Sequence, residues 1–242
     1  MQFVGDFESG DLMGWGFSGN ETTHVVTSPV RSGAFAALMV VGPSDAVPYR
    51  SELVAGDAGS FHDGQEYWIG VSHRIVDWGA DLPAWATLFQ THAVPHELPN
   101  GEHDWSCNAG KNSITVVTSD DMLRLHVVVN PDPSQLPGTG AIATKVWEEP
   151  FVVGVWVDWV FRYRPSTGAD GVIEAWRDGD QVYTQYGANR FALDNCNLPT
   201  APFTYMKVGI YRDKANTSTQ TLAYDEVRIF AGTNGYQAVA PQ

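Results

Sequence analysis

The sequence predicts an all-β protein, a two-sheet sandwich of jelly-roll type, and three observations support this. Glycine (24), proline (14), tryptophan (9) and tyrosine (9) are common while charged residues make up 17% of the chain, which suits many strands joined by turns. About a dozen short segments alternate apolar and polar residues, and none keeps a helical period. No repeat or Pro/Gly/Ser-rich linker divides the chain, so we expect a single domain spanning residues 1–242.

Turn signals separate the expected strands. Pro29 and Gly33 mark the turn between the first two strands, a proline-containing connection at 42–48 leads to the third, and Arg177-Asp178-Gly179-Asp180 marks a hairpin. Residues 93–112 and 131–147 break the pattern, and we expect long loops there, of the kind that often line binding sites. The expected strands cover residues 22–27, 34–41, 49–54, 67–76, 84–92, 113–118, 122–130, 152–164, 172–176, 181–186, 203–212 and 221–230.

The charge of the chain restricts its partners. The formal net charge is -14, the isoelectric point is about 4.7, and there are only 14 lysines and arginines. These values argue against nucleic acid as a partner, because phosphate binding needs many lysines and arginines, and we expect none. A polyanionic substrate would need a cleft that is positive against the overall sign. No apolar stretch reaches the roughly 18 to 20 residues that span a bilayer, so we expect no membrane partner.

The N-terminus and the cysteines bear on the compartment. Residues 1–6 lack a basic segment followed by an apolar run. The protein is therefore either intracellular or, as we expect, secreted or periplasmic with a leader that is absent from this sequence. Cys107 and Cys196 are the only cysteines. They form either one disulfide, as suits a secreted protein, or two buried thiols. We also expect a monomer.

The expected strand 203–212 has two unlike faces. Side chains alternate along a strand, so Met206, Val208 and Ile210 share one face, while Tyr205, Lys207, Gly209 and Tyr211 share the other. The first face suits a hydrophobic core. The second carries two phenols, an amine and a glycine, which suits a large polar ligand lying across it.

Two further strands carry polar residues two positions apart. Arg50 and Glu52 share a face of one strand, and Gln90 and His92 share a face of another. If these strands neighbour strand 203–212 in one sheet, all of these side chains project into one groove.

These segments carry a family resemblance. Arg-Ser-Glu-Leu at 50–53, Gln-Thr-His at 90–92 and Tyr-Met-Lys-Val-Gly-Ile-Tyr at 205–211 resemble the three motifs of jelly-roll alginate lyases, which read RSEL, QIH or QVH, and YFKAGVY. Thr91, Met206 and Val208 depart from that pattern. The segments at 7–15, 156–161, 171–176 and 224–229 are similar to the heparin lyase I-like and glucuronan lyase group, so the resemblance spans nearly the whole chain and implies a concanavalin-like jelly roll.

The resemblance implies β-elimination on a 4-O-linked uronic-acid polymer such as alginate or glucuronan, giving a 4,5-unsaturated uronate end. Loss of the C5 proton builds negative charge on the adjacent carboxylate, which Arg50, Gln90 and His92 would neutralise. The base is either His92 or Tyr211, and Tyr211 protonates the leaving O4. Lys207, Tyr205, Glu52 and Arg212 are the expected substrate-binding residues, with Glu52 read as an ion-pair partner that orients Arg50.

A structural calcium ion is a further expectation. Residues 6–11 hold three carboxylates beside a glycine, which suits either a calcium ligand set or a solvated turn. The resemblance implies that Glu8 and Asp225, from the first and last strands, share the ion. We expect no cofactor in catalysis.

Two other functions compete with a lyase. A non-catalytic carbohydrate-binding module or lectin-like sandwich would explain the aromatic residues, but not the Arg, Gln, His, Lys and Tyr positions. A glycoside hydrolase needs two carboxylates across a cleft, and Glu52 has no evident partner in the motifs.

Overall fold

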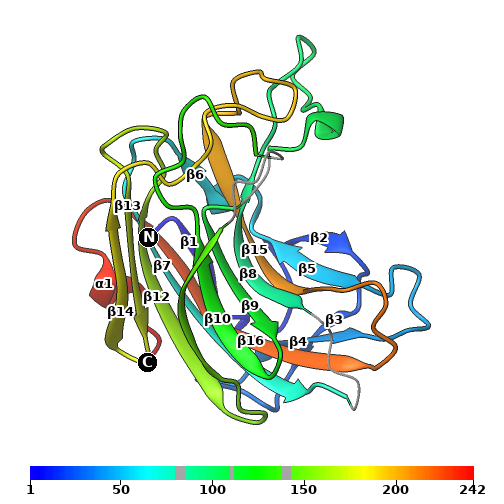
Figure 1. The fold of residues 1–242 in the computed structure, drawn as a ribbon. Helices are drawn as coiled ribbons and strands as arrows, with labels where there is room; N and C mark the ends of the chain where they lie inside the picture. The colour runs from blue at the N-terminus through cyan, green and yellow to red at the C-terminus, as the bar shows by residue number, and fades with distance from the viewer. Residues whose placement is uncertain (80–84, 110–111, 138–142) are drawn as a thin grey trace.

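The protein is a sandwich of two antiparallel sheets, seen in a computed structural model that describes residues 1–79, 85–109, 112–137 and 143–242 (Figure 1). The back sheet has the strand order β14-β13-β12-β7-β16-β4-β3, with β1 paired to β16. Its strands are β1 (Phe3–Gly5), β3 (Thr23–Val26), β4 (Ala36–Val41), β7 (Tyr67–Asp77), β12 (Trp156–Arg164), β13 (Val172–Arg177), β14 (Asp180–Tyr186) and β16 (Gln220–Ala231).

The front sheet has the strand order β11-β10-β9-β8-β15-β5-β2, with β6 paired to β15. Its strands are β2 (Gly16–Gly19), β5 (Arg50–Val54), β6 (Ser60–His62), β8 (Ala86–Ala93), β9 (Ile114–Ser119), β10 (Met122–Val127), β11 (Thr144–Pro150) and β15 (Phe203–Arg212). Short helical turns lie at Gly56–Gly59 (η1), Trp105–Cys107 (η2) and Tyr236–Val239 (α1). No helix in the described ranges has the length and apolar character to cross a bilayer.

The jelly-roll prediction is therefore confirmed, and each expected strand is present within a few residues of its predicted bounds. The start of the strand predicted at 152–164 is wrong: residues 153–154 form a turn, and Gly154 has a φ of 85°. Strand β11 occupies part of the loop predicted at 131–147. Residue 84 and parts of the two predicted loops (110–111 and 138–142) lie outside the described residues.

The core lies between the two sheets. Met206, Val208 and Ile210 of β15 are fully buried there, as their parity predicts, and they belong to the same hydrophobic cluster as Trp159 and Tyr224 of the back sheet. The Tyr224 hydroxyl donates a hydrogen bond to the Leu88 carbonyl of β8 at 2.5 Å, which ties the sheets together. The opposite face of β15 is thereby turned away from the core.

Cys107 and Cys196 form a disulfide, with a Cα–Cα distance of 5.2 Å. The disulfide joins two long connections, 94–109 after β8 and 187–202 before β15. These project together from one end of the front sheet (Figure 1). Of the two states expected for the cysteines, the bonded one is present.

Candidate active site

The three polar motifs lie on adjacent strands of the front sheet. Strand β15 pairs with β8 on one side and with β5 on the other. Lys207 lies opposite Gln90, Tyr205 opposite His92, and Tyr211 opposite Arg50. The same face of three neighbouring strands thus carries the residues that the sequence singled out.

A bulge in β15 sets the direction of Tyr211. Val208 is opposite Phe89 and Tyr211 is opposite Thr87, so three steps on β15 match two on β8. Gly209 lies inside this bulge with a φ of 148°, a conformation that favours glycine. A Cβ there would meet Glu52 Cα at 2.5 Å, so glycine also permits the close approach of β5.

Glu52 is the centre of a buried polar network. Its carboxylate accepts a hydrogen bond from the Gln90 amide, and it lies 3.4 Å from Arg50 Nε and 3.8 Å from Lys207 Nζ. Burial raises the pKa of Glu52, while the Lys207 and Arg50 cations and the Gln90 amide lower it. Two cations share this one buried carboxylate, so the network carries a net charge of about +1 within a chain of net charge -14 when all three groups are ionised.

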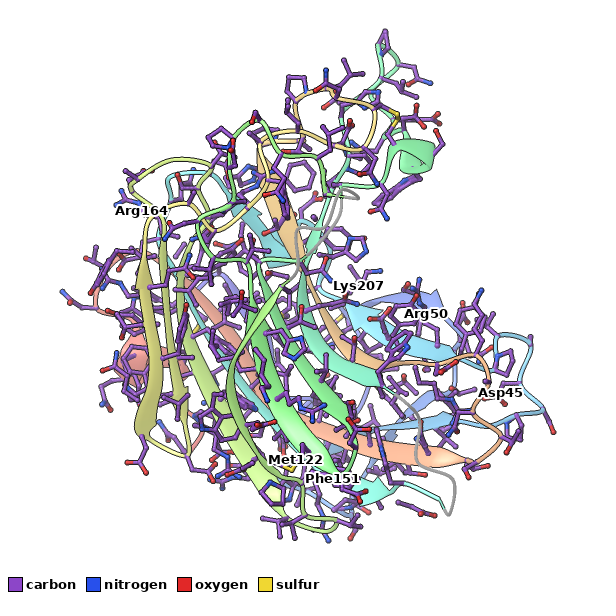
Figure 2. The ribbon with its side chains drawn as sticks, in the orientation of Figure 1. Asp45, Arg50, Met122, Phe151, Arg164 and Lys207 are labelled. Atoms are coloured by element: carbon purple, nitrogen blue, oxygen red, sulfur yellow. A yellow bond between two sulfur atoms is a disulfide. The ribbon has the colours of Figure 1, made fainter. Side chains whose placement is uncertain are left out.

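Gln90 and Lys207 are held in place by further contacts. Gln90 Oε1 accepts a hydrogen bond from Asn112 Nδ2 at 2.5 Å, and Lys207 Nζ lies 3.3 Å from Ser18 Oγ. Burial lowers the pKa of Lys207, although Glu52 opposes this effect. Figure 2 shows Arg50 and Lys207 near each other, below the projecting loops in this view.

His92 is held as a neutral imidazole. Its Nδ1 lies 2.7 Å from the Ala93 carbonyl oxygen, a contact in which only a protonated Nδ1 can donate. Burial is the main reason why the pKa of His92 falls to about 3, and the Lys207 and Arg50 charges lower it further. The ring lies 5.1 Å from that of Tyr205, whose pKa burial raises to about 12. In the neutral ring, Nε2 keeps its lone pair.

Tyr211 stands among a cation and two aromatic rings. The Arg50 guanidinium carbon lies 4.0 Å from the centre of the Tyr211 ring. Trp85 meets this ring edge-on at 5.0 Å, and Tyr49 lies 6.3 Å away. The phenol is half-buried, so it is fixed in direction and accessible from the groove.

Arg50, Gln90, His92 and Tyr211 all line one open cavity of about 570 Å³. The other wall comes from β9 and β10, through alternate residues that include Thr115, Val117, Arg124 and His126. Sequence reasoning missed these residues, along with Trp85, Asn108 and Asn112. The alternation of residues 113–118 indicated that one face of this strand is accessible. No feature of the local sequence indicated that this face lies beside Gln90.

Neither Arg212 nor Glu52 contacts the substrate as expected, although Glu52 does have the predicted role of ion-pair partner to Arg50. Arg212 is fully buried, and its guanidinium donates to the carbonyl of Pro48 and to Asn216 Oδ1. It has the same parity as Ile210, so it points away from the groove. Glu52 is 1% exposed, and its carboxylate faces Arg50, Lys207 and Gln90, so it holds other side chains rather than contacting the substrate.

The carboxylates expected to bind calcium have other partners. Glu8 accepts hydrogen bonds from the backbone amides of Ala34 and Phe35, at 3.0 Å each. Asp225 accepts from the amides of Arg31, Ser32 and Glu226, between 2.8 and 3.1 Å. These N–H donors point their positive ends at carboxylate oxygens that keep further lone pairs, so a calcium ion shared by Glu8 and Asp225 stays a prediction. In the structure, both carboxylates hold the turn at 31–35 in place.

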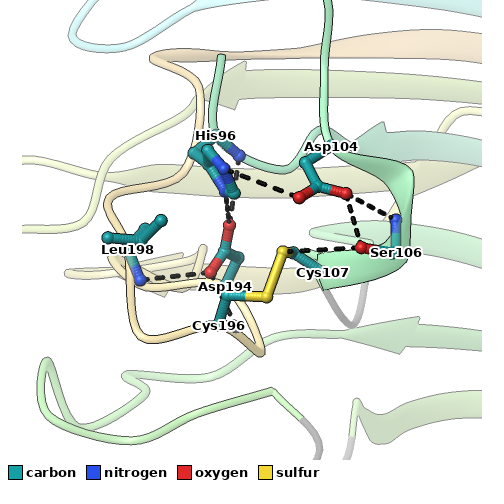
Figure 3. Close-up of a disulfide and its surroundings, with 7 residues drawn as sticks. All are labelled: His96, Asp104, Ser106, Cys107, Asp194, Cys196 and Leu198. Atoms are coloured by element: carbon teal, nitrogen blue, oxygen red, sulfur yellow. Dashed lines mark hydrogen bonds and ion pairs between the residues drawn. A yellow bond between two sulfur atoms is a disulfide. The ribbon is translucent and has the colours of Figure 1, made fainter. Parts of the chain in front are cut away.

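One cluster in the described ranges has metal-ligand chemistry, namely His96, Cys107 and Asp194. It lies at the disulfide that links the two loops (Figure 3). Cys107 is disulfide-bonded, and His96 Nδ1 lies 2.5 Å from Asp194 Oδ2. The cluster therefore braces the loops in this state and offers no thiolate to a metal.

Comparisons with known proteins identify a family and agree with this fold. The family model for polysaccharide lyases matches residues 7–228. No curated protein matches the chain. Among solved structures, the endo-beta-1,4-glucuronan lyase from the fungus Trichoderma reesei is 20% identical with a TM-score of 0.71, over 99% of this chain and 98% of that chain.

Two other solved structures share the fold at lower similarity. Alginate lyase A1-II', a member of polysaccharide lyase family 7, is 15% identical with a TM-score of 0.56, over 89% of this chain and 85% of that one. The cellulose induced protein Cip1 is also 15% identical, with a TM-score of 0.58, over 94% of this chain and 96% of that one.

Proposed function

The chain belongs to the polysaccharide lyase family, and from this premise we propose that it cleaves a 4-O-linked uronic-acid polymer by β-elimination, leaving a 4,5-unsaturated uronate end. One observation carries the proposal: Arg50, Gln90, His92 and Tyr211, from three separate parts of the sequence, line a single open cavity. A uronate ring in that cavity would meet a cation, an amide, an imidazole and a phenol together.

The first task of the site is to neutralise the substrate carboxylate. Removal of the C5 proton spreads negative charge onto that carboxylate, so fixed positive groups lower the barrier. Arg50 and Lys207 supply two positive charges against the one negative charge of Glu52. The amide of Gln90 has its direction fixed by Glu52 and Asn112, and its second N–H, which has no hydrogen-bond partner within the described part of the chain, can donate to the substrate. These groups are organised before the substrate arrives.

The second task is to take the proton, and we assign it to His92 Nε2. Nδ1–H donates to the Ala93 carbonyl, so the lone pair lies on Nε2. The low pKa of His92 in the free enzyme keeps Nε2 unprotonated near neutral pH. A bound carboxylate offsets the Lys207 and Arg50 charges, which raises the pKa of His92 towards the range where proton transfer is efficient. His92→Gln at the wild-type rate would transfer this role to Tyr211.

The third task is to protonate the leaving O4, and Tyr211 is the acid. Its phenol borders the cavity and is stacked against the Arg50 guanidinium. As the C4–O4 bond breaks, the Tyr211 hydroxyl gives its proton to O4, and the electron pair of the C5–H bond becomes the C4–C5 double bond. The nearby cation stabilises the phenolate that results.

The substrate class follows from charge. Arg124, a cation on the cavity wall, is already paired with Glu148 and Asp120. The free positive charge of the site is then about one unit, which suits one carboxylate per sugar. A sulfate-rich chain would demand more cations. Glucuronan and alginate are the preferred substrates, and the disulfide supports action outside the cytoplasm.

The test is an ultraviolet assay of the purified protein on glucuronan, polymannuronate, polyguluronate and heparin. The proposal expects absorbance from the unsaturated product on at least one of the first three polymers. Reducing ends without that absorbance would mean hydrolysis, and binding without either signal would mean a carbohydrate-binding module. Both outcomes would overturn the lyase mechanism.

A further inference from the structure

Trp105 is an exposed tryptophan beside the cavity that the reaction above does not use. It begins η2 in the connection 94–109, and 56% of its surface is exposed, although large aromatic side chains are usually buried. Asn108, three residues further on, lines the same cavity as His92 and Tyr211. The loop that presents Trp105 thus forms part of the cavity wall.

The indole is connected to the site through aromatic contacts. Its ring meets that of His92 edge-on at 6.0 Å, and that of His103 edge-on at 6.1 Å. His103 in turn packs against Phe203, which lies two positions before Tyr205 on β15. The indole is supported by these edge contacts, and more than half of its surface is left open.

The segment that carries Trp105 is tightly fixed. Asp104 caps η2 by accepting from the Ser106 amide, and Cys107 is bonded to Cys196 (Figure 3). The Asn195 amide donates to the Cys107 carbonyl at 2.8 Å. The buried Asp194 carboxylate accepts from the backbone amides of His96, Cys196 and Leu198. A rigid mount of this kind lowers the entropy cost of using a loop residue for binding.

We propose that Trp105 is a sugar-binding platform, on which a pyranose ring of the same polymer stacks beside the residue held at His92. This inference rests on the proposed function. The occupant is a sugar of the bound chain because the indole is continuous with the cavity through His92 and Asn108. A pyranose offers a face of C–H groups that suits an aromatic ring, while its carboxylate stays in solvent. Trp85, beside Tyr211, borders the other side of the polar centre.

The platform contributes to binding and not to the chemical step. One aromatic contact is worth a factor of about two to ten in affinity. Trp105→Ala should therefore raise KM on the preferred polymer about two- to tenfold while kcat stays within about twofold. Trp105→Phe should recover part of the loss. Tyr186→Ala, which removes an exposed aromatic residue from β14 of the back sheet, is the matched control and should leave KM unchanged.

The disulfide allows an independent test of the platform. If the disulfide holds Trp105 in position, mild reduction of the folded protein should raise the KM of the wild type. The same treatment should not raise the KM of Trp105→Ala any further. Calorimetry measures the affinity for an oligouronate without turnover when Tyr211 is replaced by phenylalanine. The Tyr211→Phe, Trp105→Ala double variant should bind the oligouronate two- to tenfold more weakly than Tyr211→Phe alone.

The outcomes separate the two proposals. A wild-type protein that cleaves no uronate polymer defeats the proposed function itself. If the wild type cleaves a uronate polymer but Trp105→Ala has an unchanged KM and an unchanged oligouronate affinity, only the platform proposal is wrong. A fall in kcat at constant KM would also overturn it, since Trp105 would then act on the transition state.

Discussion

His92 should stay unprotonated far below the pH at which an ordinary histidine takes up a proton. Burial, together with the Lys207 and Arg50 charges, lowers its pKa from 6.5 to about 3. At pH 5 a histidine of pKa 6.5 is about 97% protonated, whereas one of pKa 3 is about 1% protonated. The proposed base is therefore unprotonated at pH 5 and above in the free enzyme, and the pH profile of kcat/KM, which reports the free enzyme, should show no step near pH 6.5 from His92.

This shift also makes His92 a source of acid instability. The folded pKa is depressed, so the unfolded chain binds the extra proton. The stabilisation is present above about pH 6.5 and is lost as the pH falls towards about 3. A shift of about 3.5 pKa units corresponds to an upper bound of about 5 kcal/mol, of which about 3 kcal/mol would be lost between pH 7 and pH 4. Partial exposure of the ring reduces both figures.

The assay compares the free energy of unfolding of the wild type and of His92→Gln by urea titration at pH 7, 5.5 and 4. The variant is needed because burial also lowers the pKa of His73, in the back sheet, to about 3, so this residue also contributes to the loss of stability in acid. The wild type should lose more stability on acidification than the variant. Ring nitrogen shifts measured by NMR give a second readout. A His92 titration midpoint near 6.5 would refute both the buried neutral imidazole and its assignment as base.

Three other predictions concern the catalytic acid, the buried network and the carboxylates of the turn at 31–35. Tyr211→Phe should abolish turnover and retain oligouronate binding, as measured by ultraviolet rate and calorimetry; a near wild-type rate would remove Tyr211 from its role. Glu52→Gln leaves Arg50 and Lys207 without their counter-charge and should destabilise the fold by about 3 kcal/mol, or on the order of 10 °C in melting temperature; an unchanged melting curve would contradict the ion-pair network. If Glu8 and Asp225 share a calcium ion, chelation should lower the melting temperature by several degrees; an unchanged melting temperature would leave the backbone amides as the partners of these carboxylates and count against the ion.

Strand periodicity made much of the fold predictable. The alternation in 203–212 placed Met206, Val208 and Ile210 in the core and the opposite face in the groove, and the structure agrees. The same rule applied to Arg212 would have placed it on the core side. Strand β11 was missed because its alternation is weak and its surface is largely exposed.

The site was predictable only where short motifs repeated a known arrangement. The order of β5, β15 and β8 in the sheet brings together residues that are up to 161 positions apart, namely Arg50 and Tyr211. Asn112 and Trp105 have no local signal, because their roles depend on how one connection folds against β8 and on the disulfide that fixes it. The carboxylates of Glu8 and Asp225 resembled metal ligands, but their partners are amides of a turn distant in sequence.

The most direct measurement is a crystal structure of Tyr211→Phe with a bound oligouronate. The account predicts one uronate carboxylate within hydrogen-bond distance of Arg50 and Gln90, with its C5 facing His92 Nε2. An oligouronate bound instead on the back sheet, or one lying in the cavity with its carboxylate turned away from Arg50 and Gln90, would contradict it.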